Sequence, residues 1–128
     1  MRILGIAVLL GASLAVSAVE AKPSAETLIN SAISDIDSHH ALVTRVNIPA
    51  GLTLPKHYHP TEEFLYVASG STILAIEGER EQLLTKGMAA KIPAKAVHTA
   101  STTDGAAEVI VFRIQPNGQP VRIPVKEQ

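Results

Sequence analysis

One segment of this 128-residue chain guides the interpretation of the rest: Gly51-Leu-Thr-Leu-Pro-Lys-His57-Tyr-His59-Pro-Thr-Glu-Glu63-Phe-Leu-Tyr-Val-Ala-Ser-Gly70. His57 and His59 stand two residues apart, and side chains two apart leave the same face of a β-strand. Pro60 and Thr61 are a turn signal, after which Glu63 opens an apolar run and can return over the same space. Two imidazoles and a carboxylate that converge on one point are metal ligands by type and spacing. The segment therefore predicts a metal site.

A third histidine lies in a second segment, Gly87-Met-Ala-Ala-Lys-Ile-Pro93-Ala-Lys-Ala-Val-His98. Together the two segments resemble the two sequence motifs of the cupin superfamily. The first matches glycine, five residues, His-x-His, three residues, glutamate, six residues and glycine, and the second matches glycine, five residues, proline and a histidine five positions on. Lys95 stands where the family usually has glycine, and Thr102 stands where it often has asparagine. Neither position is a metal ligand in the family, so the departures concern loop geometry.

The resemblance covers roughly residues 42 to 125 and is to small single-domain cupins of the cupin_2 type. It implies an all-β fold, the cupin double-stranded β-helix or jelly-roll barrel. It also implies that His57, His59, Glu63 and His98 are metal ligands and that the protein is a homodimer. The alternative is a relic of the motif that binds no metal.

The turn pattern predicts a small β-barrel without reference to any family. Short apolar or β-branched runs alternate with glycine turns, and Asp104-Gly105 and Asn117-Gly118 are tight-turn dipeptides. Such spacing is typical of a barrel or jelly roll. The predicted strands are 42–48, 53–59, 63–68, 72–77, 82–84, 89–93, 96–102, 107–114 and 121–125.

Strand alternation predicts which side chains face the pocket. Residues that share the inward phase form three sets: Thr53, Pro55, His57 and His59; Glu63, Leu65 and Val67; His98, Ala100 and Thr102. Phe64 and Tyr66 then face outward and need cover from a helix or from a second subunit. Both faces of 107–114 are apolar, so Arg113 is either an exposed strand charge, the interpretation we favour, or an inward group that holds a substrate carboxylate.

The N-terminal 21 residues have the features of an export signal. Met1-Arg2 gives a positive start, an apolar run follows, and small residues offer cleavage after Ala18 or Ala21. The apolar run is shorter than the ~20 residues needed to span a bilayer. We expect the mature protein to be periplasmic or secreted, with no stable membrane association after signal cleavage.

The next segment predicts an amphipathic helix over 24–36, because apolar residues recur at helical spacing and Ser24 can cap its start. The apolar positions are Ala25, Leu28, Ile29, Ala32, Ile33 and Ile36. His39 and His40 are interpreted as part of a solvated loop, since adjacent strand residues face opposite sides and cannot easily share a metal. The predicted organisation is therefore a signal peptide at 1–21, a helix and linker at 22–41, and one cupin barrel at 42–128.

The composition of the chain limits the classes of molecule that it is expected to bind. The formal net charge is −1, aromatic residues are 3% of the chain and cysteine is absent. The charge gives no reason to expect nucleic acid or an anionic membrane surface as a partner. The absence of cysteine excludes disulfides and thiolate ligands.

The ligand types fit Fe, Mn, Ni, Cu, Co or Zn and do not choose among them. In an octahedral ion four protein ligands leave two positions for a small oxygen-containing molecule. The protein would then be a dioxygenase, lyase or isomerase, with Glu63 doubling as a base. The alternatives are a binding protein without turnover and a structural module that the metal staples together. Metal affinity should fall below about pH 6.5, the ordinary histidine pKa.

Overall fold

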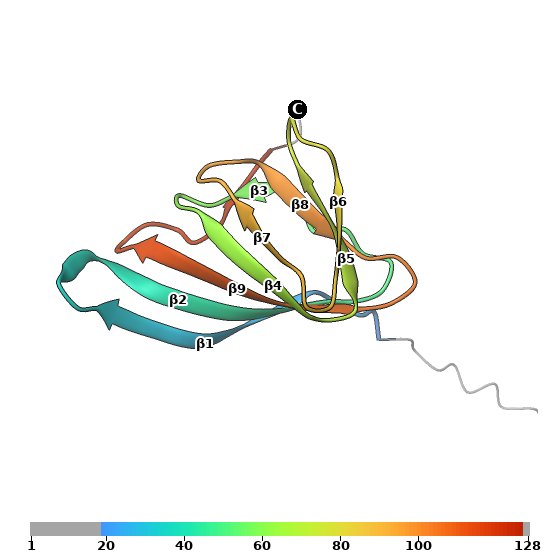
Figure 1. Ribbon diagram of the computed structural model, residues 1–128, viewed down its shortest axis with the longest axis horizontal. Coiled ribbons are helices and arrows are strands. Elements are labelled where there is room, and N and C mark those ends of the chain that lie inside the picture. Colours follow the sequence, from blue (N-terminus) through green and yellow to red (C-terminus); the bar gives the residue numbers. More distant parts are fainter. Residues whose placement is uncertain (1–18, 127–128) are drawn as a thin grey trace, which may run out of the picture.

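Two five-stranded antiparallel sheets make up the described part of the protein, residues 19–126 of the computed structural model. The sheets face each other and close into a barrel (Figure 1), so the predicted all-β jelly-roll fold is confirmed. Most of the predicted export signal, residues 1–18, lies outside the described residues. No helix within 19–126 is long and apolar enough to cross a membrane.

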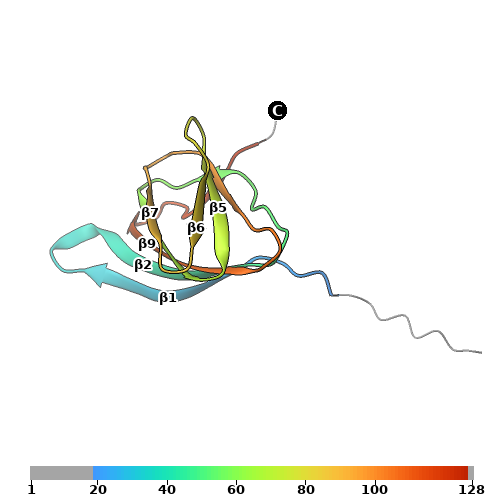
Figure 2. The same ribbon diagram turned by 45° about the vertical axis from the view of Figure 1, so that its right-hand side comes forward.

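The first sheet has the order β1-β2-β9-β4-β7, and its strands are β1 (Ser24–Ile33), β2 (Ile36–Ile48), β9 (Ala107–Pro116), β4 (Glu63–Ser69) and β7 (Ala89–Ile92). The second has the order β10-β3-β8-β5-β6, and its strands are β10 (Ile123–Pro124), β3 (His57–Tyr58), β8 (His98–Ser101), β5 (Ser71–Ile76) and β6 (Gln82–Thr85). Figure 2 shows β1 and β2 below the barrel, with their connecting turn projecting beyond it.

Alternation along the strands builds the interior. In β4, Glu63, Leu65 and Val67 are buried while Phe64 and Tyr66 are exposed, as predicted. Burial of each large aliphatic side chain contributes about 1.5–3 kcal/mol. The core that results is drawn from both sheets and comprises Ile48, Leu65, Val67, Leu74, Ile76, Leu84, Ile92, Val109 and Val111.

Two turn positions bear on the motif pattern. Gly70, between β4 and β5, has φ 69°, and a Cβ there would collide with the backbone carbonyl of Ala106, so only glycine fits. Lys95 has φ 62°, the left-handed conformation that glycine adopts freely. The loop thus keeps the glycine-like backbone although it carries a lysine.

The predicted helix over 24–36 is wrong, because these residues form β1, a turn and the start of β2. The turn contains Asp35 with φ 65°, and β1 pairs with β2 from Ser24↔Asn47 to Ile33↔Ile36. β1 is exposed along almost its whole length, so its apolar residues need not alternate, and pairing with β2 outweighs the helical spacing. The solvated loop predicted for His39 and His40 is likewise wrong, since both lie within β2.

The prediction of one continuous strand over 53–59 is also wrong. Only His57–Tyr58 form a strand, with an isolated bridge between Thr53 and Ser101. Leu52 and Leu54 pack against the core while Thr53 is exposed. The alternation therefore shifts between Leu54 and His57, and Thr53 does not share the face of the histidines.

Candidate metal centre

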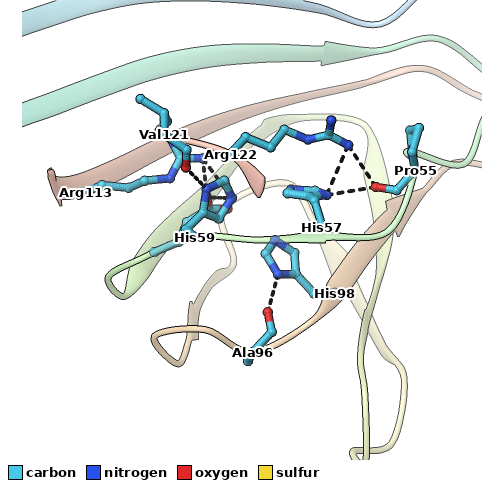
Figure 3. A network of polar contacts seen from close by, with 9 residues as sticks. Pro55, His57, His59, Ala96, His98, Arg113, Val121 and Arg122 are labelled. Carbon is cyan, nitrogen blue, oxygen red and sulfur yellow. Dashed lines mark hydrogen bonds and ion pairs between the residues drawn. The ribbon is translucent and has the colours of Figure 1, made fainter. Parts of the chain in front are cut away.

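Three histidines from the second sheet converge on one point. β3 pairs with β8 so that His57 lies opposite His98, and His59 follows two residues after His57. One ring nitrogen from each lies within 4.8 Å of the others, and the three residues are only 3–6% exposed. Figure 3 shows the three rings facing one another. The predicted convergence of residues 57, 59 and 98 is therefore present.

Backbone carbonyls fix the orientation of each ring. Nδ1 of His57 lies 2.8 Å from the carbonyl oxygen of Pro55, and Nδ1 of His98 lies 2.9 Å from that of Ala96. Nδ1 of His59 contacts the carbonyl of Val121. A carbonyl only accepts hydrogen bonds, so each Nδ1 carries the proton. When a ring is neutral, its Nε2 therefore presents a lone pair to the shared space, and Nε2 of His59 can donate to Glu63 only when that ring carries both protons.

Glu63 lies beside the histidines but is bound to Arg113. β4 pairs with β9 so that Glu63 lies opposite Arg113, and Nη2 of the arginine donates to Oε2 of the glutamate. The same Oε2 lies 3.0 Å from Nε2 of His59. Arg113 is 6% exposed, so the favoured prediction of an exposed strand charge was wrong. Glu63 reaches the edge of the centre, and its ligation of a metal stays a prediction.

The protein environment keeps the centre ready for a cation. Burial lowers the pKa of His57 to about 4, and burial also lowers the pKa of His98. For Glu63, burial raises the pKa, but the His59 hydrogen bond and the Arg113 charge outweigh it and bring the value to about 2. Two neutral imidazoles and an ionised carboxylate are the metal-binding protonation states. Protons should therefore compete with a metal for His57 and His98 only below the pH of about 6.5 that unperturbed histidines predict.

The sequence also matches a known family. A family model described as the cupin domain matches residues 44–113, more than half of the chain. The chain belongs to the cupin domain family. Among curated proteins, none matches it at a significant level.

Solved structures similar to this cupin share its fold at low sequence identity. The DMSP lyase DddQ from Ruegeria pomeroyi is 23% identical with a TM-score of 0.67, and the match covers 82% of this chain and 54% of the lyase. A cupin-like protein from Thermotoga maritima is 22% identical with a TM-score of 0.65 over 82% of this chain and 79% of that one. The polyketide cyclase RemF from Streptomyces resistomycificus is 21% identical with a TM-score of 0.64 over 83% and 72%. This chain thus spans about half the length of the lyase.

The donor set of this cupin fits a divalent transition metal. Because Nδ1 of His59 donates to Val121, a neutral His59 and an ionised Glu63 would set two lone pairs against each other at 3.0 Å. A cation between Nε2 and Oε2 removes that repulsion, and it can be a proton or a metal ion. Two donors bound at about 2.1 Å and at right angles to one ion lie ~3.0 Å apart. The three-histidine group can therefore hold a metal, whose identity the ligands do not determine.

A cavity of about 730 Å³ opens beside the histidines. Its wall is largely aliphatic and comes from both sheets, with Leu42, Ile48, Leu65, Leu74, Ile92 and Val111 among the lining residues. Its charged lining residues are Lys22, Glu63, Arg113 and Arg122. The volume lies within the range of small-molecule pockets, about 300–1,000 Å³.

Sequence reasoning missed Arg122, whereas it predicted correctly that Thr102 faces inward. Arg122 donates to the carbonyl of Pro55 at 2.9 Å and so braces the segment that orients His57. No sequence signal links residue 122 to residue 57. Thr102 is buried and donates to the carbonyl of Pro49, while its Oγ1 accepts from the amide of Leu52 at 3.2 Å. A threonine therefore ties together the loop before the histidines at the motif position often held by asparagine.

Proposed function

We propose that this cupin holds a divalent transition metal on His57, His59, His98 and Glu63 and there binds or converts a small oxygen-containing molecule. The observation that supports this most strongly is the set of three histidine rings with their Nε2 atoms directed inward, each ring oriented by a backbone carbonyl, beside a cavity of about 730 Å³. A bound metal would supply a Lewis acid that polarises an oxygen of that molecule. Iron, manganese, nickel, copper, cobalt and zinc all fit the ligands.

The cavity favours a small-molecule site over a structural metal. A metal that only staples strands together needs closed coordination and tight packing around it. Here the histidines lie beside a hollow interior whose volume matches that of a small ligand. The residues of the chain would orient the molecule and exclude water, because most of the lining is apolar.

Binding without turnover is the second candidate. Glu63 is the single carboxylate among the described lining residues, and Arg113 binds it. The described lining residues thus supply no second carboxylate that could act as a base. If the protein is an enzyme, lyase, isomerase or dioxygenase chemistry would depend on the metal, with Glu63 as the proton acceptor. The similarity to the lyase and the cyclase supports the fold in this proposal, but it does not identify a substrate.

Metal analysis tests the common basis of both candidates. We expect protein purified without chelator to hold about one metal ion per chain, and added metal to raise its melting temperature. His57→Ala/His59→Ala should abolish both effects, while the control His39→Ala/His40→Ala should preserve them. A double variant at 57 and 59 that melts like the parent and holds as much metal would remove the proposal.

Assays of the loaded protein then separate an enzyme from a binding protein. Oxygen-electrode measurements on catechol-like and diketone compounds address dioxygenase activity. Product analysis of the ligand that copurifies addresses lyase and isomerase activity. Spectroscopy of a cobalt-loaded form reports whether coordination positions stay open. A closed site would support the structural alternative, and an open site with no turnover would support binding alone.

We further propose that the protein is exported and works in the periplasm or outside the cell. The charged start and apolar run at the N-terminus, with small residues at 18 and 21, support this. Intact-mass measurement of exported protein should find residues 1–18 or 1–21 missing. Full-length chain in the cytosol would contradict the proposal.

We also propose a homodimer that covers the outer face of the first sheet. Phe64, Tyr66 and Phe112 are 42%, 48% and 37% exposed there, and the rings of Phe64 and Phe112 lie 6.3 Å apart. The predicted helix that could have covered this face is a strand at the edge of the same sheet. A second copy of the chain remains as the source of cover.

A further inference from the structure

We propose that the molecule bound in the cavity is an amphiphilic anion, a small carboxylate with an apolar body, whose negative charge Arg113 and Arg122 recognise. This inference rests on the proposed function, because it names the class of ligand for the same site. Its basis is the charge of the cavity, the unused donors of Arg113, the positions of the two guanidinium groups and the aliphatic remainder of the wall.

The cavity has an excess of positive charge. Its lining contains three cationic side chains, Lys22, Arg113 and Arg122, and one carboxylate, Glu63. Two positive charges are therefore in excess before any metal cation is added. A cationic ligand is disfavoured in such a cavity, and an anionic one is favoured.

Arg113 has hydrogen-bonding capacity that the protein does not use. A guanidinium group offers five N–H donors. In the described residues its Nη2 donates to Glu63, and its Nε is buried without a hydrogen-bond partner. Buried donors without acceptors are rare and call for a physical explanation. A carboxylate is the acceptor that best matches the planar fork of arginine, and two oxygens allow a bidentate contact.

The two arginines lie on different sides of the histidine group. Nη2 of Arg113, from β9, lies 3.4 Å from Nε2 of His59, whereas Nη2 of Arg122, from the segment before β10, lies 3.3 Å from Nδ1 of His57. Figure 3 shows one guanidinium beside His59 and the other on the His57 side. A carboxylate close to the histidines would therefore lie near both cations, with Arg113 buried and Arg122 at the exposed rim.

The rest of the wall selects the body of the ligand. Beyond the charged end, the inward residues of β2, β4, β5 and β9 are mostly leucine, isoleucine and valine. The uncharged polar side chains of the wall outside the metal centre are Ser24, Thr27, Asn30, His40, Thr44 and Thr72. A polyol or sugar would leave most of its hydroxyl groups without partners against the aliphatic part of this surface, and each of them would lose its hydrogen bonds to water. An alkyl or alkenyl chain buries its surface there at no such cost.

A matched pair of probes tests the inference on the zinc-loaded, full-length or naturally processed protein. Isothermal titration calorimetry would compare sodium hexanoate with hexanamide, which has the same chain length and no charge. A hydrogen bond to a charged acceptor is about twice as strong as one between neutral groups, so hexanoate should bind at least about tenfold more tightly. Equal affinities for the two probes would overturn the inference without any variant.

Variants then separate the arginines from the metal as the source of that preference. Arg113→Gln should lower the affinity for hexanoate about tenfold or more and leave that for hexanamide unchanged, and Arg122→Gln should lower it by a smaller factor, about threefold. The control Arg45→Gln removes the same charge from the outer face and should change neither affinity. Hexanoate binding that is unaffected in both Arg113→Gln and Arg122→Gln would assign the preference to the metal alone and overturn the inference.

The outcomes also separate this inference from the proposed function. If the protein holds metal but does not prefer hexanoate, the inference fails and the metal-site proposal stands. If the protein holds no metal, the proposed function itself fails. Should Arg113→Gln not fold, by circular dichroism, the test passes to Arg122→Gln, whose side chain is exposed, and retention of the full hexanoate preference there would overturn the inference.

Discussion

Each face of the β1-β2-β9-β4-β7 sheet carries an arginine bound to glutamate, and the two pairs lie in opposite environments. On the inner face, the side chains of Arg113 and Glu63 are 8% and 7% exposed. On the outer face, Arg45 lies 2.9 Å from Glu26 and 3.6 Å from Glu108, with side chains 38%, 63% and 35% exposed. Arginine–glutamate ion pairs therefore occur both buried and exposed to solvent within one sheet.

The difference shows how the sheet divides its roles. Water screens the outer charges, and exposed ion pairs typically contribute about 0–1 kcal/mol. The inner charges have lost their water, so each depends on the other and on the histidines nearby. The inner pair therefore sets the electrostatics of the candidate site, while the outer face is open to contact with other molecules.

The largest expected effect breaks the inner pair. In metal-free protein, Arg113→Gln leaves Glu63 as a buried charge without its arginine partner and should lower the free energy of unfolding by about 3–5 kcal/mol. Arg45→Gln, the matched change on the outer face, should lower it by less than about 1 kcal/mol. Urea denaturation followed by circular dichroism measures both.

A second variant identifies the cause of the loss. Glu63→Gln/Arg113→Gln removes both charges together and should be more stable than Arg113→Gln alone, because no buried charge remains uncompensated. Equal losses for Arg113→Gln and Arg45→Gln would show that burial does not distinguish the two pairs.

The next effect is the pH dependence of the metal-free protein. The pKa of His57 is about 4 in the folded protein and about 6.5 in the unfolded chain, so the unfolded chain binds more protons between these values. Stability should therefore fall as the pH drops from about 6.5 towards 4. Glu63, with its pKa lowered to about 2, extends the loss from about 4.5 downwards. Each group contributes on the order of 1 kcal/mol or more.

Unfolding free energies measured at a series of pH values check this sign. His57→Gln should make the upper part of the profile less steep, between about pH 6.5 and 4, where His98 also contributes, and leave the lower part in place. A metal-free parent whose stability is constant from pH 6.5 to 4 would contradict the burial of His57 as a neutral ring.

The sequence predicted well the elements whose two faces differ. Glu63, Leu65 and Val67 alternate with Phe64 and Tyr66, so both the strand and its inner face were predicted correctly. The histidines were recognised because the His-x-His spacing puts both rings on one face of a strand and is also typical of metal ligands. In contrast, β1 is exposed on both faces, and the spacing of its apolar residues happened to fit a helix. Only pairing with β2, a tertiary contact, decides its conformation.

Arg113 could not be placed for a related reason. Both faces of β9 are apolar, so alternation within that strand does not tell which face is inner. The deciding fact is the register that sets Glu63 opposite Arg113, and strand register between residues fifty positions apart is not visible in one sequence. The inward face of a strand that is apolar on both sides is thus harder to predict than that of a strand with polar or metal-ligand residues on one side.

The smallest expected effect on stability comes from the outer face, where Phe112 is 37% exposed. Phe112→Gln should change the unfolding free energy of the monomer by no more than about 0.5 kcal/mol, as is usual for surface substitutions. If the outer face binds a second copy, the same change should weaken the dimer about tenfold or more, since buried aromatic residues dominate interfaces. Analytical ultracentrifugation over a concentration series measures that dissociation constant.

Leu83→Gln is the control for the dimer prediction, because Leu83 is 62% exposed on β6 of the other sheet and its substitution should leave the dimer intact. A parent protein that stays monomeric at high concentration would leave the inner face as the functional face and the outer aromatics as ordinary exposed surface.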